Sequence, residues 1–287
     1  MVRLFVIVVA LCWSLNSIAQ KKDIQLIVRG DDMGYTHSGN VALIKSFKEG
    51  IQKSIEVIVP SPWFPEAVKM LKENPGVDIG IHIALTSEWD NVKWRPLTDC
   101  KSLKDSNGYF FPMVYPNKNY PGQSIVENNA TIEDIEMEIR AQIEMAKKHL
   151  PGISHISGHM GCTNLNADVR ALISKLSKEY GFISESELKN LSYLGFSQQW
   201  KTAEEKIDKF LELLDKMEAG KTYLFVEHPG IDNEELRAVH HIGYENVASD
   251  RQGVTDMFTS SKVKAKIAEK KIKLIGYGDL RTEYISE

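Results

Sequence analysis

Two adjacent carboxylates, Asp31 and Asp32, closely follow an apolar segment, residues 24–28, that is typical of a buried strand. Regular strand geometry points consecutive side chains to opposite faces of a sheet. Both acids therefore serve one site only if the chain bends there, which Gly30 and Gly34 permit. Neighbouring carboxylates also repel each other, and we expect a bound cation to offset that repulsion.

Three histidines stand near the ends of later segments with strand character: His82 in GIHIALT, His159 in HISGHMG and His228 in VEHPG. Because active sites of β/α barrels gather at the carboxyl ends of strands, we expect these side chains to meet. A carboxylate with two imidazoles is a familiar ligand set for a catalytic divalent metal. Each residue alone also has a structural interpretation, since a strand histidine often serves packing and an Asp before Gly often holds a turn. Recurrence at successive strand ends favours a shared site.

The elements that would position these residues alternate between strand-like and helix-like segments. The predicted strands are residues 24–28, 55–59, 77–84, 153–156, 182–184, 223–227 and 272–275, and the predicted helices are residues 41–48, 64–72, 132–149, 168–178, 204–217 and 254–270. Such alternation predicts a parallel sheet, and no glycine-rich nucleotide-binding fingerprint follows any strand. The predicted fold class is therefore α/β, a (β/α) barrel of about seven strands.

One long connection, residues 85–130, interrupts this alternation and is rich in aromatic residues and proline. Connections of this length in a compact domain are usually functional or disordered, and the aromatic content argues against disorder. No linker or repeat divides the chain. We therefore expect a single domain over residues 20–287.

The first residues, 1–19, predict a signal peptide: a short basic start, an apolar run too short to span a bilayer, and small residues before a cleavage point. The protein is thus expected to be exported to the periplasm or the extracellular space, without a membrane anchor.

A net charge of −4 without basic patches argues against nucleic acid as a partner. Cys100 and Cys162 remain after cleavage of the signal peptide. The sequence is compatible either with one disulfide bond between them or with two free thiols. A homodimer is compatible with the sequence, which does not decide the oligomeric state.

The motifs VRGDDMG, GIHIALT, HISGHMG and VEHPG, in this order and followed by SDRQGVTDMFTS, resemble the YdjC-like carbohydrate deacetylase family over nearly the whole mature chain. The resemblance implies a barrel related to the polysaccharide deacetylases, which removes acetyl groups from N-acetylated sugars or oligosaccharides with one divalent cation, Mg²⁺ or Zn²⁺. By match of position it implies that Asp32, His82 and His159 bind the metal and that Asp31 is the base.

The chain departs from the family pattern at two positions. Many members carry an aspartate two residues before the second metal-binding histidine and a histidine two residues after it, where this chain has Ser157 and Gly161. The presumed ligands are retained, but groups around them set ligand orientation and basicity. The chain therefore resembles a divergent branch.

The chemistry expected from these residues is metal-assisted amide hydrolysis. An amine leaves only after protonation, and His228 is the candidate general acid. Substrate contacts are predicted for Trp89, Trp94 and Arg251, with core packing as the alternative for the tryptophans. Three rival functions stay open: a glycosidase, which adjacent acids fit poorly; a metal-dependent phosphoesterase; and a secreted glycan-binding protein with a degenerate site.

Overall fold

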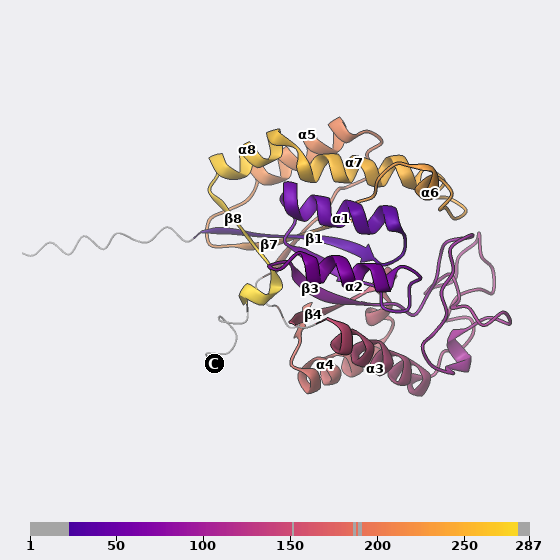
Figure 1. Cartoon of the computed structure of the whole chain (residues 1–287). Coiled ribbons are helices and arrows are strands. Elements are labelled where there is room, and N and C mark those ends of the chain that lie inside the picture. Colours follow the sequence, from indigo (N-terminus) through magenta and orange to yellow (C-terminus); the bar gives the residue numbers. More distant parts are fainter. Residues whose placement is uncertain (1–22, 151, 186–187, 189–190, 281–287) are drawn as a thin grey trace, which may run out of the picture.

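The computed structural model describes residues 23–280 except 151, 186–187 and 189–190, so the predicted signal peptide lies outside the described residues (Figure 1). The strands are β1 (Ile24–Met33), β2 (Ser54–Val57), β3 (Asp78–Ile83), β4 (Ile153–Gly158), β5 (Ile183–Ser184), β6 (Leu191–Leu194), β7 (Thr222–Glu227) and β8 (Ile272–Ile275). The α-helices are α1 (His37–Glu49), α2 (Phe64–Glu73), α3 (Ile132–His149), α4 (Ala167–Tyr180), α5 (Ala203–Asp215), α6 (Glu234–Arg237), α7 (Val247–Thr259) and α8 (Ser261–Glu269).

The strands form one parallel sheet in the order β5-β4-β3-β2-β1-β7-β6, and β8 also pairs with β1. The helices lie on its outer side (Figure 1). Within the described part of the chain, no backbone pairing joins the two end strands, β5 and β6. The predicted α/β barrel is therefore confirmed in the form of a curled sheet that does not close.

Strand β1 occupies the centre of the sheet because its apolar residues are buried on both faces. Its first half pairs with β8 and its second half with β2. The helix α3 begins where the sequence predicts, with the hydroxyl of Thr131 accepting a hydrogen bond from the Asp134 N–H at 3.3 Å. The predicted helix over residues 254–270 is wrong in one respect: Ser260, at ψ 130°, divides it into α7 and α8. Strand β6 was not predicted.

The predicted bend at the two aspartates is confirmed, and it lies within the last residues of β1, which extends to Met33. Asp32 adopts φ 71°, a left-handed conformation that is costly for a residue with a side chain, and the β1–β2 register shifts between Gly30 and Met33. Gly34 follows with φ 109°. This bend allows Asp31 and Asp32 to face the same site.

The long connection, residues 85–130, is packed and ordered in the structure. Trp89 and Trp94 are each only 2% exposed, and both belong to the main hydrophobic core. Cys100 and Cys162 are buried free thiols, which answers the question of their pairing. No helix in the described ranges is long and apolar enough to cross a membrane.

We expect Gly34→Ala to lower the free energy of unfolding by about 2 kcal/mol or more, because left-handed strain adds to the overlap of the new methyl group with Ser61 Oγ. Gly76→Ala is the matched control, since Gly76 has φ 95° but open space around the added atom. It should show only the backbone strain, about 1 kcal/mol. Urea unfolding measures both values, and equal losses would contradict the proposed crowding.

Candidate active site

A cavity of about 730 Å³ opens at the carboxyl ends of the strands. Its lining includes all five residues predicted for the metal and the proton transfers: Asp31, Asp32, His82, His159 and His228. They come from the ends of β1, β3, β4 and β7, or directly after them. The parallel sheet brings these strand ends together, as the sequence pattern predicts.

Three of these residues form a cluster that could hold a metal. One ligand atom from each of Asp32, His82 and His159 lies within 4.8 Å of the others, and all three residues are buried. Asp32 Oδ1 is 3.5 Å from His82 Nε2 and 3.1 Å from His159 Nδ1. Ligand atoms around one ion at about 2.1 Å lie about 3.0–3.4 Å apart, so this donor set fits a divalent cation.

The electrostatics of the cluster also suit a cation. Burial would raise the pKa of Asp32, but His159, His228 and Arg251 outweigh burial and hold it well below the ordinary value. Burial would lower the pKa of His159, but the carboxylates of Glu88 and Asp32 outweigh burial and raise it to about 10. Without a cation, a proton on His159 therefore balances the acids. Metal binding must displace that proton.

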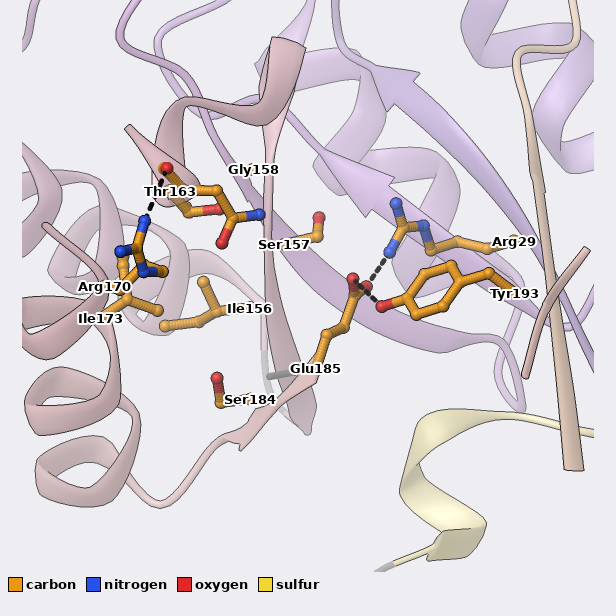
Figure 2. A pocket seen from close by; sticks show the side chains of 11 residues that line it. Arg29, Ile156, Ser157, Gly158, Thr163, Arg170, Ile173, Ser184, Glu185 and Tyr193 are labelled. Carbon is orange, nitrogen blue, oxygen red and sulfur yellow. Dashed lines mark hydrogen bonds and ion pairs between the residues drawn. The ribbon is translucent and has the colours of Figure 1, made fainter. Parts of the chain in front are cut away.

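Asp31 is held by a partner that the sequence reasoning missed. Arg29 donates from Nε to Asp31 Oδ1 at 2.7 Å and from Nη2 to Asp31 Oδ2 at 3.0 Å, a two-bond pairing that fixes the carboxylate plane. Arg29 also pairs with Glu185, whose other oxygen accepts from the Tyr193 hydroxyl at 3.1 Å. Figure 2 shows Glu185, which directly follows β5, contacting both Arg29 of β1 and Tyr193 of β6. Side chains therefore connect the two ends of the sheet.

His228 lies at the mouth of the cluster. Its side chain is 39% exposed, and its Nε2 is 3.9 Å from Asp32 Oδ2. Burial acts to lower its pKa, but the charges of Asp32 and Glu227 outweigh that effect and raise it. A histidine that keeps its proton and contacts the cavity has the properties of a general acid.

The three predicted substrate residues have different surroundings. Arg251 Nη2 donates to Asp32 Oδ2 at 2.9 Å, and its guanidinium lies 4.7 Å from the Tyr35 ring centre and 5.1 Å from that of Trp89. Trp89 lines the cavity, although little of it is exposed. Trp94 packs against His159 in the core, with ring centres 6.0 Å apart. The structure therefore favours the core-packing alternative for Trp94.

Several cavity residues escaped the sequence reasoning. Glu88 is buried, and its Oε2 lies 2.8 Å from His159 Nε2. Phe196 and Trp200, between β6 and α5, line the cavity and are partly exposed. The sequence does contain an indication for Arg29, because a charged residue next to a buried strand segment needs a partner of opposite charge. Glu88 and the two aromatic residues carry no comparable local signal, because only folding brings them to the strand ends.

A curled parallel β/α sheet with a buried aspartate–histidine–histidine cluster at its strand ends defines an open α/β barrel protein whose cluster could hold a metal ion. The sequence profile described as YdjC-like protein matches residues 25–269 of this chain. The chain belongs to the YdjC-like family.

Two curated relatives and one solved structure are similar to this chain. Carbohydrate deacetylase 1 of Listeria innocua is 26% identical over 269 residues, spanning 89% of this chain and 100% of that protein. A carbohydrate deacetylase of Thermus thermophilus is 32% identical over 158 residues, 55% of this chain and 52% of that protein. A crystal structure from Enterococcus faecalis, provisionally described as a cellobiose-phosphate cleavage protein, has TM-score 0.71 at 23% identity and covers 90% of this chain and 99% of its own. It shows the fold.

We expect about one divalent ion per chain, and we expect the His82→Ala, His159→Ala double variant to lose it, because one carboxylate cannot hold the ion alone. His37→Ala is the control, since His37 is an exposed histidine that pairs with Glu66. Elemental analysis of dialysed protein, with circular dichroism to verify folding, measures the effect. Full occupancy in the double variant would refute the ligand assignment.

Proposed function

We propose that this protein is a hydrolase that removes acetyl groups from N-acetylated sugars or oligosaccharides with the help of one divalent cation. The single observation that carries the proposal is the convergence of Asp32, His82 and His159, with Asp31 and His228 beside them, in one cavity. Membership of the YdjC-like family supports it, as do curated relatives named carbohydrate deacetylases.

Asp32, His82 and His159 would hold the cation, which when bound would polarise the acetyl carbonyl and lower the pKa of water from about 15.7 toward about 7. Two imidazoles suit Zn²⁺ or another transition metal, while the family resemblance also allows Mg²⁺. Arg251 keeps Asp32 in place through its hydrogen bond at 2.9 Å. Arg251 also lines the cavity, and we assign it to a substrate oxygen.

The proton transfers fall to two residues. Asp31 would accept the proton of the attacking water, and its pairing with Arg29 keeps the carboxylate oriented toward the cavity. His228 lies near Asp32 Oδ2, whereas His82 and His159 lie near Asp32 Oδ1. His228 would donate a proton to the departing amine. Its raised pKa keeps that proton available near neutral pH.

Two partly exposed aromatic residues, Phe196 and Trp200, offer a wall for a sugar ring. Phe196 is anchored by edge-to-face packing on Phe225, with ring centres 5.4 Å apart. We propose that Phe196, Trp200 and the cavity edge of Trp89 contact the sugar ring. Substrate contact was predicted from the sequence for Trp89 and Trp94. Export to the periplasm or beyond, where such oligosaccharides would be met, remains part of the proposal.

Asp31→Asn should slow acetate release from every substrate by about 10²–10⁴-fold, because every substrate needs an activated water. His228→Ala should slow release from an N-acetylated chito-oligosaccharide more than from an aryl acetate, whose leaving group departs without protonation. The measurement is acetate release by both variants, with metal content checked in each.

If His228→Ala slows acetate release equally from both substrates, His228 contributes to substrate binding and does not donate the proton. Loss of metal in Asp31→Asn would make Asp31 a ligand. A folded, metal-loaded wild-type protein that binds oligosaccharides but releases no acetate from any of them would instead identify a glycan-binding protein.

Trp200→Ala should raise KM for the oligosaccharide severalfold with little change in thermal stability, because Trp200 is partly exposed at the cavity. Trp94→Ala is the contrast: Trp94 is buried, and we expect it to lower the free energy of unfolding by about 3–5 kcal/mol. Thermal unfolding and steady-state kinetics separate the two effects. Unchanged KM in a folded Trp200→Ala protein would remove Trp200 from the substrate wall.

A further inference from the structure

The ring nitrogen of His82 that faces away from the cavity has a partner. His82 Nδ1 lies 2.6 Å from Ser157 Oγ, while His82 Nε2 faces Asp32 Oδ1 at 3.5 Å and Asp31 Oδ2 at 3.6 Å. The Ser157 hydroxyl in turn donates to Glu56 Oε2. All of these residues are at least nine-tenths buried, so water does not compete for the hydrogen bonds.

The other oxygen of Glu56 is also occupied. Glu56 Oε1 pairs with His155 Nε2, whose ring is stacked on Tyr277 with centres 3.7 Å apart. Burial would raise the pKa of Glu56, but His155 and Arg29 outweigh burial and lower it to about 2. Glu56 is therefore a fixed carboxylate that can only accept protons in hydrogen bonds.

This fixed acceptor decides the direction of each hydrogen bond in the chain. Because Glu56 has no proton to give, the single proton of the Ser157 hydroxyl points toward Glu56. The Ser157 oxygen must then accept from His82, so the proton of neutral His82 resides on Nδ1. The lone pair is left on Nε2, the nitrogen that faces the two aspartates. A metal ligand needs that lone pair.

We propose that Glu56, acting through Ser157, is a positioning residue that holds His82 in the tautomer and orientation required for binding the catalytic cation. The inference rests on the metal site of the proposed function. Neither residue touches the cation or the substrate. Glu56 lies on β2, Ser157 on β4 and His82 on β3, so the relay connects three neighbouring strands below the cavity.

The chain offers a control outside the relay. Ser46, on α1, is also a buried serine, and its hydroxyl contacts none of the relay residues. Ser157→Ala should weaken Zn²⁺ binding about 10- to 100-fold, whereas Ser46→Ala should leave the Kd unchanged. Competition titration with a chromogenic chelator measures Kd without reference to activity, and thermal unfolding of the metal-free proteins monitors stability.

Ser157→Thr tests the hydroxyl itself. Ser157 borders a second cavity of about 160 Å³, which it shares with Arg29 and Glu185, so the additional methyl group has space (Figure 2). Threonine keeps the donor and acceptor, and it should restore Zn²⁺ binding to near the wild-type Kd. Restored affinity supports the relay. A threonine variant that is folded but binds as weakly as Ser157→Ala overturns it.

A double-mutant cycle tests whether Glu56 acts through Ser157. Glu56→Gln keeps the size of the side chain but removes its charge, and it should weaken Zn²⁺ binding about fivefold in the wild-type background. In the Ser157→Ala background it should have no further effect on Kd. Additive losses would overturn the relay, because Glu56 would then act by another route.

The outcomes separate this inference from the proposed function. A wild-type protein that binds Zn²⁺ and releases acetate, together with an unchanged Kd for Ser157→Ala, overturns the relay alone. A wild-type protein that binds no divalent cation overturns both.

Discussion

Two neighbouring negative charges at the end of a buried strand are the constraint around which the site is organised. Asp31 and Asp32 are both almost fully buried, so each needs its own compensation. Arg29 compensates Asp31 with two hydrogen bonds from the same strand. Arg251 compensates one oxygen of Asp32, and the other oxygen is left to the histidines. The different partners give two adjacent, identical side chains different chemical properties.

The unclosed sheet is part of the same arrangement. A fully hydrogen-bonded barrel would have strand pairing where β5 and β6 end, whereas here Glu185 accepts from Arg29 and from Tyr193 across the gap. The interior of the sheet is accordingly polar, with Glu56, His155 and Arg29 buried below the cavity. Glu56 pairs with His155, and Arg29 pairs with Asp31 and Glu185, so these three buried groups orient the site without an unpaired charge among them.

The departure at Ser157 changes how His82, a proposed metal ligand, is supported, but it does not leave His82 without a hydrogen-bond partner. A serine is too short to supply a carboxylate, yet its hydroxyl lies between Glu56 and His82. Gly161 adopts φ 72° in the turn after β4, a conformation that glycine adopts without strain. The cluster of Asp32, His82 and His159 is therefore retained in a chain that differs from the family pattern around it.

The sequence by itself determined the strands and helices with strong apolar periodicity, the bend at Asp31 and Asp32, and the residues at strand ends that could bind a metal. Those features depend on local spacing and on the rule that parallel strands end at one edge. Strand β6 was not predicted because it has only four residues and none of them is fully buried, so the sequence shows little apolar periodicity there.

Only the tertiary structure decided the partners of the charged residues whose contacts lie far away in the sequence. Glu56, Glu88 and Arg251 lie far apart in the sequence, and each finds its contact through the packing of strands and loops. The same holds for Trp94, whose burial against His159 cannot be read from an aromatic residue in a long loop. Local spacing predicts which residues reach a strand end, whereas hydrogen bonds between distant side chains exist only after the chain has folded.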